Sequence, residues 1–324
     1  MAITTFDFEK PLLELEQKLA EAEQAEPRDD AMLAQLREEL ERRQREIYSQ
    51  LSPWQRVLVA RHQDRPHSLD YVKAMMTDFI EIHGDRAFGD DQAMVCGFAT
   101  FRGRPLAVVA QQKGRDTKEN LMRNWGMSHP EGYRKALRVM RLAEKFRLPI
   151  VVFIDTPGAF PGIGAEERGQ AEAIARNIRD MFTIEVPIIC VVVGEGASGG
   201  ALGVGVGDTI LMLENSWYCV ISPEGCAAIL WKDRGQAERA AEQLKLTPPD
   251  LMELGIIDEI IPEPLGGAHK RPEDTYANVA AALERWMAQL TAVPVDELIE
   301  RRYQKYRSMG RFVDTTVDTD AETL

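Results

Sequence analysis

The sequence predicts an α/β fold built around a parallel sheet. Residues 150–154 and 188–193 are short apolar runs rich in β-branched residues and bounded by turn residues, as strands buried on both faces are. A helical pattern over residues 165–182 lies between them, and a strand–helix–strand order is typical of parallel sheets. Glycine-rich loops follow both runs, so we expect these loops at the carboxyl edge of the sheet, where ligands usually bind.

The composition indicates a globular, acidic protein. The 324 residues allow one large domain with an appendage, and 44 % of them are hydrophobic. The net charge of −13 argues against nucleic-acid binding. The four cysteines form no C-x-x-C pair, which argues against a metal site of the structural-zinc type and against a disulfide framework. Neither a basic and then apolar leader nor an apolar run near the roughly 20 residues of a membrane span is present. We therefore expect a cytoplasmic protein that binds no membrane.

Residues 1–60 are predicted to form a helical hairpin used in docking or assembly. Residues 24–30 resemble a turn, and apolar residues recur at helical spacing on both sides of it, namely Leu12, Leu15, Leu19, Leu33, Leu36, Leu40, Ile47 and Leu51. A narrow apolar stripe on a charged helix needs a partner surface. That surface belongs either to the other helix of the hairpin or to another subunit.

The main domain is expected to span residues 61–313. It should open with a helix over 68–82 with Ser68 as its N-cap, a loop at 84–91, and strands at 94–101 and 106–111. A loop or broken helix over 113–130 and an amphipathic helix over 131–146 come next. Residues 113–147 hold ten Lys or Arg against four Asp or Glu, so we expect this segment to face either an anion or an acidic partner, or else solvent.

The carboxyl-terminal part continues the alternation. We expect strands at 209–213, 217–221 and 256–261, a helix capped by Ser222, and further helices near 235–244, 248–254, 275–292 and 295–307. The acidic segment 314–324 is expected to be disordered.

Residues 194–200 fit two well-known motifs. Gly194, Gly196 and Gly199 match the G-x-G-x-x-G dinucleotide fingerprint, with Glu214 about 20 residues on as a ribose-binding acid. The next strand is expected by Thr209, however, which leaves room only for a very short helix and argues against a dinucleotide-binding protein.

The same stretch fits the G-x-S-x-G pattern of a serine hydrolase. Ser198 would be the nucleophile. A catalytic triad would then depend on His269, with Asp258 upstream, because no other histidine follows Ser198.

A third interpretation uses the backbone. Gly199 and Gly200 would present free N–H groups at a helix start and form an oxyanion hole, with no Cβ to block a carbonyl group. Residues 149–268 contain no histidine, so the substrate itself would provide the base. The alternative is that glycines here only permit tight packing. That accounts well for Gly203, Gly205 and Gly207, and less well for the adjacent pair.

Several longer segments carry a resemblance to a known family. They are residues 6–9, 65–66, 69–72, 84–87, 112–115, 130–138, 153–177, 194–208, 220–226 and 261–269. Through them the chain resembles the α subunits of bacterial acetyl-CoA carboxylase carboxyltransferases along nearly its whole length. The resemblance implies a crotonase-like (ClpP/crotonase) fold, which is a repeated ββα superhelix, here with an N-terminal helical hairpin.

The resemblance also implies a reaction. The carboxyl group of carboxybiotin, carried on a biotin carboxyl carrier protein, would be transferred to acetyl-CoA to give malonyl-CoA for fatty acid biosynthesis. Gly199 and Gly200 match the family's oxyanion hole, and the implied substrate-binding residues are Gly158, Ala159, Phe160, Gly162, Gly164, Gly196, Ala197 and Ser198. Family members often carry a histidine where this chain has Gln111.

The implied partners complete an ATP-binding complex. A β subunit with a zinc ribbon would hold most of CoA in an α2β2 assembly, and biotin carboxylase would work beside it. This chain has no four-cysteine ribbon, so the resemblance is to the α subunit alone, with no metal of its own.

Overall fold

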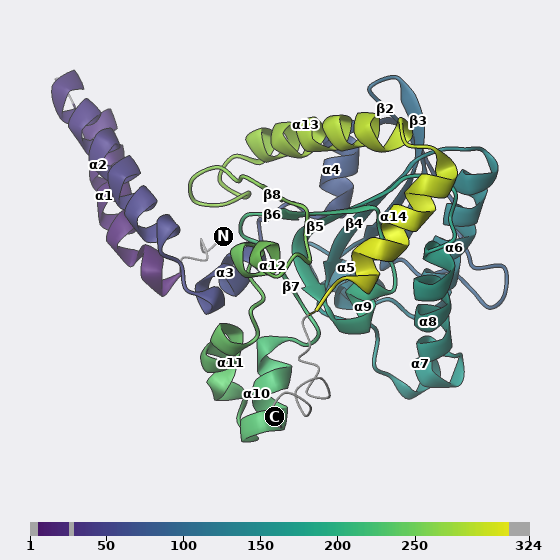
Figure 1. Ribbon diagram of the computed structural model, residues 1–324. Coiled ribbons are helices and arrows are strands. Elements are labelled where there is room, and N and C mark those ends of the chain that lie inside the picture. Colours follow the sequence, from purple (N-terminus) through teal and green to yellow (C-terminus); the bar gives the residue numbers. More distant parts are fainter. Residues whose placement is uncertain (1–5, 26–28, 311–324) are drawn as a thin grey trace, which may run out of the picture.

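A computed structural model describes residues 6–25 and 29–310, and its centre is an eight-stranded sheet with helices on both faces (Figure 1). The strand order is β1-β2-β3-β4-β5-β6-β8, and β7 pairs with β5. The strands are β1 (Thr77–Glu81), β2 (Met94–Phe101), β3 (Arg104–Gln111), β4 (Ile150–Thr156), β5 (Ile188–Ala197), β6 (Thr209–Leu213), β7 (Trp217–Cys219) and β8 (Glu259–Ile261).

The sheet is mixed. The strands from β3 through β4, β5 and β6 to β8 run parallel, which confirms the predicted parallel sheet. The strands β1, β2 and β3 are antiparallel, because β2 and β3 are joined by a tight turn rather than by a helix. The carboxyl ends of β4 and β5 therefore lie at the same edge of the sheet.

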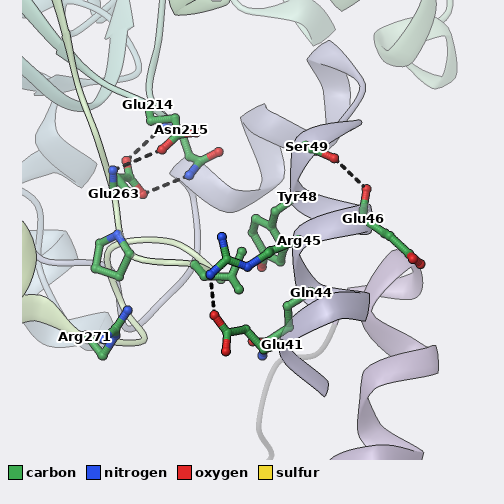
Figure 2. Close-up of a pocket in the computed structure, with 13 residues that line it drawn as sticks. Glu41, Gln44, Arg45, Glu46, Tyr48, Ser49, Glu214, Asn215, Glu263 and Arg271 are labelled. Carbon is green, nitrogen blue, oxygen red and sulfur yellow. Dashed lines mark hydrogen bonds and ion pairs between the residues drawn. The ribbon is translucent and has the colours of Figure 1, made fainter. Parts of the chain in front are cut away.

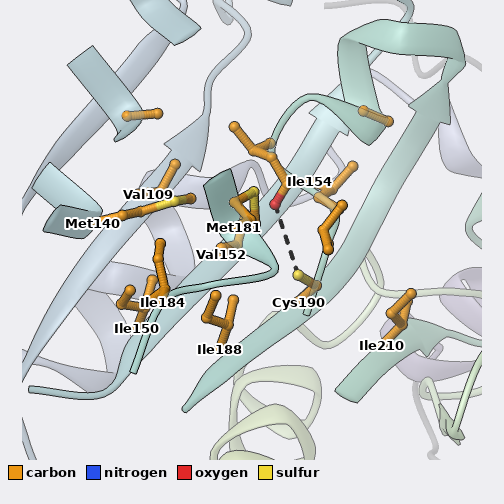
Figure 3. Close-up of a cluster of buried hydrophobic side chains, with 14 of the residues drawn as sticks. Val109, Met140, Ile150, Val152, Ile154, Met181, Ile184, Ile188, Cys190 and Ile210 are labelled. Atoms are coloured by element: carbon orange, nitrogen blue, oxygen red, sulfur yellow. Dashed lines mark hydrogen bonds between the residues drawn. The ribbon is translucent and has the colours of Figure 1, made fainter. Parts of the chain in front are cut away.

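Two hydrophobic clusters fill the two faces of the sheet, and successive strand residues alternate between them. On one face α6 (Pro130–Lys145) and α8 (Gln170–Met181) pack over residues such as Val109, Val152 and Ile188 (Figure 3). On the other face α4 (Ser68–Met75) and α13 (Pro272–Thr291) pack over Val108, Val151 and Ile189. Burial on both faces explains why β4 and β5 are continuous apolar runs in the sequence.

The remaining helices surround this core. They are η1 (Asp7–Glu9), α1 (Lys10–Gln24), α2 (Asp30–Ser49), α3 (Pro53–Ala60), α5 (Thr117–Met122), η2 (Asn124–Gly126), α7 (Ile163–Glu167), α9 (Ser198–Leu202), α10 (Pro223–Trp231), η3 (Arg234–Gln236), α11 (Ala237–Gln243), α12 (Pro248–Glu253) and α14 (Val295–Arg307). As expected, Ser222 caps α10 by accepting from the N–H of Gly225. None of the helices in the described part of the chain is long and apolar enough to cross a membrane.

The N-terminal hairpin consists of α1 and α2, and it projects away from the sheet (Figure 1). Leu12 and Leu33 are buried in this part of the chain, and Leu36 and Leu40 are half-buried. The hairpin therefore covers much of its own apolar stripe. At its base a small cluster of Tyr48, Leu51 and Val59 joins it to the main domain. The expected turn at 24–30 lies partly, and the acidic segment 314–324 wholly, outside the described residues.

Some predicted boundaries are wrong. The helix expected over 68–82 ends at Met75, because the backbone becomes extended at Met76 and pairs with β2 as β1; its N-cap is His67, not Ser68. The helix expected over 165–182 breaks at Gly169, whose φ of 84° is left-handed, into α7 and α8. The strand expected to stop at residue 193 runs on to Ala197, because its last residues pair with β7. Strands β7 and β8 are shorter than expected.

Candidate active site

The glycine-rich loop that follows β4 and the glycine-rich turn from β5 into α9 touch each other at Gly200. A Cβ on Gly200 would lie 2.3 Å from the carbonyl carbon of Gly158 and 2.5 Å from the amide nitrogen of Ala159. Real Cβ atoms do not approach backbone atoms so closely, so only glycine permits this contact. Two segments about forty residues apart in the sequence thus meet at one point of the sheet edge.

The turn from β5 into α9 presents backbone N–H groups. Ser198 has a φ of 60°, so the right-handed turn begins in effect at Gly199. The first N–H groups of a helix have no acceptor within it. The carbonyl oxygen of Gly199 accepts from the N–H of Gly203 at 2.8 Å. Because the peptide unit is planar, this bond directs the N–H of Gly200 away from the helix.

Packing explains some of the glycines here and not others. A Cβ on Gly203 would meet the ring of Tyr133 at 2.9 Å, and one on Gly207 would meet the Sγ of Cys190 at 2.8 Å. Gly200 is also required by packing. A Cβ on Gly199, in contrast, would meet only the side chain of Ile174, at 3.7 Å, which is an ordinary contact. Gly199 is therefore not explained by close packing.

The carbonyl group of Gly200 is fixed from the interior side. The Nε2 of Gln111 donates to it at 2.7 Å, and the hydroxyl of Tyr133 donates at 3.3 Å. Gln111 lies at the end of β3 and is fully buried. An amide side chain that donates to a backbone carbonyl positions the glycine turn and offers no basic group.

The segment over residues 156–164, from the end of β4 to the start of α7, is held by its neighbours. The Oγ1 of Thr156 lies 2.7 Å from the carbonyl oxygens of both Gly126 and Gly158, and it accepts from the N–H of Gly158 at 3.1 Å. The ring of Phe160 stacks on His129 with ring centres 4.2 Å apart. These contacts hold the segment that meets Gly200.

A mostly apolar cavity of about 380 Å³ opens beside the start of α9. Its lining residues are Ser198, Gly199, Leu202, Tyr218, Cys219, Val220, Leu244, Lys245, Leu251, Leu254 and Ile256. Of the residues predicted for the site, Ser198 and Gly199 thus face this cavity. Gly196 and Ala197 are buried in β5, Gly158, Ala159, Phe160 and Gly162 belong to the neighbouring loop, and Gly164 lies in the first turn of α7.

A larger cavity of about 940 Å³ lies between α2 and the loop that follows β8, with Arg45 and Tyr48 on one wall and Glu263 and Arg271 on the other (Figure 2). It contains none of the predicted site residues. Its walls carry both acidic and basic side chains.

A buried charge cluster, which the sequence did not reveal, lies beneath the two glycine loops. The Nζ of Lys113 is 2.6 Å from Asp155 Oδ1 and 2.7 Å from Glu195 Oε2. Burial alone would raise the pKa of Asp155, but the charge of Lys113 and the hydrogen bond of His67 hold this pKa well below its usual value. For Lys113 the signs are reversed. Burial alone would lower its pKa, but the charges of Asp155 and Glu195 hold this pKa above its usual value. A partial signal was available, since Asp155 follows the first apolar run directly and Glu195 follows the second after one glycine, Gly194.

The geometry does not supply a catalytic triad for Ser198. Its φ of 60° resembles a nucleophile elbow. Within residues 6–25 and 29–310, however, no histidine or carboxylate is hydrogen-bonded to it. His269 instead stacks on His62 with ring centres 3.8 Å apart, and burial lowers the pKa of His269 to about 3. The structure also argues against a dinucleotide-binding site, because the helix that follows the glycines, α9, has only five residues.

The positively charged side chains of residues 113–147 largely form ion pairs and hydrogen bonds with other groups of this chain. Arg134 pairs with Asp85 at 2.7 Å, Lys135 with Asp90 at 2.5 Å, and Arg138 donates to the carbonyl oxygen of Gly84. This segment is therefore neither a free anion site nor a simple solvated face. No cluster of three or more potential metal ligands occurs among the residues that the structure describes.

Comparison with known sequences gives a consistent result. The family described as acetyl co-enzyme A carboxylase carboxyltransferase-like matches residues 5–310. The acetyl-coenzyme A carboxylase carboxyl transferase subunit alpha of Geobacter metallireducens is 56 % identical over 313 residues, which cover 95 % of this chain and 98 % of that protein. The protein of the same name from Geobacter sulfurreducens is 61 % identical over 268 residues, covering 83 % of this chain and 84 % of that protein.

Comparison with solved structures concerns the fold. The transcarboxylase 12S core has a TM-score of 0.54 at 23 % identity, covering 68 % of this chain and 41 % of that one. The β subunit of Pseudomonas aeruginosa geranyl-CoA carboxylase has a TM-score of 0.55 at 17 % identity, covering 76 % and 46 %. A Pseudomonas malonate decarboxylase hetero-tetramer in complex with coenzyme A has a TM-score of 0.55 at 17 % identity, covering 68 % and 89 %. These likenesses confirm the crotonase-like fold.

Proposed function

The chain belongs to the family of acetyl-CoA carboxylase carboxyltransferase α subunits, and we propose that it transfers the carboxyl group of carboxybiotin to acetyl-CoA within a site that a second, β-type subunit completes. It is a carboxyltransferase subunit of fatty acid biosynthesis, and its product is malonyl-CoA. The donor would be biotin on a separate biotin carboxyl carrier protein, and acetyl-CoA would be the acceptor.

The chemistry needs stabilised negative charge more than it needs a protein base. When bound, carboxybiotin would supply the carboxyl group by cleavage of its bond to the ureido nitrogen, and the nitrogen freed in this way could accept the proton that the acetyl methyl group loses when the new C–C bond forms. We assign the N–H groups of Gly199 and Gly200 to the oxygen atom on which charge develops on the biotin side. The macrodipole of the five-residue α9 is small, so the two local N–H groups would do this directly.

The turn at Ser198, Gly199 and Gly200 is the observation that carries this assignment. Its N–H groups lie in the first turn of α9 and next to an apolar cavity, and Gly199 has no packing reason to be glycine. The residues Gly158, Ala159, Phe160, Gly162 and Gly164 of the segment that follows β4, together with Gly196, Ala197 and Ser198, would bind and orient the substrate. The 380 Å³ cavity suits a mostly apolar ring system, since its walls are largely aliphatic and aromatic.

The dependence on a β subunit is supported by exposed apolar side chains. Val220 and Leu254, which line the cavity, are mostly exposed in this chain, and so are Ile229 and Leu230 on α10. Exposed apolar surface of this kind is typical of protein contacts. We therefore propose a zinc-ribbon β subunit as the partner, an α2β2 assembly, association with biotin carboxylase and its carrier protein, and a cytoplasmic location.

The test is a comparison of the chain alone with the chain mixed with a separately purified β-type subunit. Decarboxylation of malonyl-CoA in the presence of free biotin measures the reverse reaction. We expect turnover only in the mixture, because one chain supplies one glycine-pair hole while the reaction develops charge on two oxygen atoms. Robust turnover by the folded chain alone would contradict the shared site.

A second arm addresses the hydrolase alternative. Ser198→Ala in the mixture should keep most of the turnover, and a serine-reactive phosphonate should not label Ser198. Covalent labelling together with loss of activity in the alanine variant would favour a nucleophilic serine instead.

A further inference from the structure

We propose that Lys113 is a positioning residue whose ammonium group holds the two glycine-rich loops in the arrangement that the oxyanion hole requires. The inference rests on the function proposed above, because it concerns the same site. It assigns to Lys113 no contact with substrate. Its role is to fix the relative placement of two backbone segments.

The ammonium group of Lys113 bridges two neighbouring strands at their carboxyl ends. It lies 2.6 Å from Asp155 Oδ1, on β4, and 2.7 Å from Glu195 Oε2, on β5. The N–H of Glu195 also donates to Asp155 Oδ1, at 3.1 Å. The backbones of the two strands are thus tied at one point by a cation shared between two anions.

Each carboxylate leads directly into one of the two loops. Asp155 is followed by Thr156, Pro157 and Gly158, and Glu195 is followed by Gly196 and the turn that ends at Gly200. Gly158 and Gly200 are the residues whose backbones touch. A change in the distance between the two carboxylates would therefore shift the contact on which the oxyanion hole depends.

The position of Lys113 is itself fixed. A Cβ on Gly126 would lie 2.8 Å from the Cγ of Lys113 and 3.3 Å from the carbonyl oxygen of Asp155, so the turn at Gly126 covers the lysine stem. Residues 124–126 all have positive φ, of 48°, 58° and 80°. Backbone conformations of this kind persist only where the surroundings fix them. The carbonyl oxygen of Gly126 is bound in turn by Thr156 Oγ1, at 2.7 Å.

The remaining oxygen atoms of the two carboxylates are occupied by other side chains. His67 Nδ1 lies 3.3 Å from Asp155 Oδ2, and Arg61 Nε lies 2.5 Å from Glu195 Oε1. Arg61 also pairs with Glu224 at 2.5 Å. Without Lys113, the buried carboxylates of Asp155 and Glu195 would lie near each other with no cation between them. Two like charges in this arrangement repel each other.

Lys113→Met removes the charge and keeps most of the stem. In the complex with the β-type subunit, we expect kcat to fall by about tenfold to a hundredfold, since a displacement of about 1 Å in a positioned group has effects of that size. The KM for malonyl-CoA should change by less than about threefold, because Lys113 does not touch substrate. A merely structural role would lower the amount of folded enzyme and leave kcat per folded site unchanged.

Lys305 offers a matched control. Its side chain is 16 % exposed, against 14 % for Lys113, and it likewise pairs with a carboxylate, that of Asp258. It lies at the opposite edge of the sheet, where β6 and β8 begin. Lys305→Met should therefore cost stability of the same order and keep kcat near the wild-type value.

A double variant separates repulsion from positioning. In Lys113→Met/Glu195→Gln one of the two facing charges is gone, so the thermal transition should recover toward the wild-type temperature. The bridge remains absent, and kcat should stay low.

The outcomes can be told apart. If the wild-type complex transfers no carboxyl group, the proposed function fails. If it does so, and folded Lys113→Met shows wild-type kcat, or loses kcat only as much as Lys305→Met does, the positioning role of Lys113 is wrong. If the KM rises and kcat does not change, Lys113 acts on binding and the inference is also wrong.

Discussion

Gly200 is the residue at which packing and the proposed chemistry coincide. Gly200→Ala places a methyl group within 2.3–2.8 Å of the backbone of Gly158 and Ala159, so that loop must move. We expect turnover in the complex to fall about a hundredfold or more, which is the effect of losing one oxyanion donor. Steady-state kinetics of the variant mixed with a β-type subunit measures this.

Gly199→Ala is the control for folding, because its new methyl group would make only ordinary contacts, at 3.7 Å with Ile174. Its thermal unfolding should match that of the wild-type chain. Wild-type turnover of Gly200→Ala would leave tight packing as the only reason for this glycine.

His269 makes the stability of the chain depend on pH. Both of its ring nitrogens are buried without a hydrogen-bond partner among the described residues, and burial lowers its pKa from 6.5 to about 3. Between these values the unfolded chain binds a proton that the folded chain does not, so the free energy of unfolding decreases as the pH falls. The contribution is about 1.4 kcal/mol per pH unit.

His269→Phe should remove this contribution. Urea unfolding from pH 6.5 down to pH 4 should show a smaller loss of stability in the variant than in the wild-type chain, and near-equal stability at pH 7.5. Parallel pH profiles for the two proteins would mean that His269 is protonated in the folded state.

At the level of single residues, the sequence revealed the glycines and missed what holds them. A glycine pair after an apolar run is a local pattern, and it is readable without knowledge of the fold. The bridge of Lys113 joins residues that are 42 and 82 positions apart in the chain, so no local pattern contains it. Gln111 is similar, since its partner, the carbonyl oxygen of Gly200, lies 89 positions away.

Among the elements, α14 depends on one buried guanidinium group. Arg302 is fully buried and forms two hydrogen bonds with Asp208, at 2.7 and 2.8 Å. It also donates to the backbone carbonyl oxygens of Met181, Ile184 and Val186. Arg302→Leu leaves the buried carboxylate of Asp208 without its cation and with the N–H of Ile188 as its remaining donor, and breaking such a pair costs about 3–5 kcal/mol.

Urea unfolding followed by circular dichroism measures this loss. Arg301→Leu, on the exposed side of the same helix, removes only a pair with Glu297 and should cost less than about 1 kcal/mol. Equal losses for the two variants would show that α14 is not anchored through Arg302.

The elements that were mispredicted share a physical cause. Residues 68–82 contain enough helix-forming residues to suggest one helix, yet pairing with β2 takes the second half into β1. Residues 194–197 contain two glycines, which usually end a strand, yet pairing with β7 extends β5 through them. In both cases a tertiary contact overrides a local preference. The buried strands β4 and β5 were predictable because burial on both faces leaves a continuous apolar run.

At the scale of the whole molecule, the hairpin of α1 and α2 contributes little to the packing around the sheet. Its helices bury Leu12 and Leu33, and its links to the main domain include the small cluster of Tyr48, Leu51 and Val59 at its base and an ion pair of Glu16 with Lys270. Neither large cluster on the two faces of the sheet includes a hairpin residue. The hairpin therefore contributes little to the stability of the main domain.

We expect deletion of residues 1–51 to weaken assembly more than it perturbs the sheet. The deletion keeps α3, whose Val57 and Ala60 pack with Trp217. The truncated chain should retain a cooperative thermal transition within a few degrees of the full chain, since about 1 kcal/mol shifts such transitions by about 2–4 °C at this size. Sedimentation with a β-type subunit should show a smaller or weaker complex. An unchanged complex would assign assembly to the apolar surface near Val220 and Leu254 alone, whereas loss of the thermal transition would show that the hairpin is part of the core.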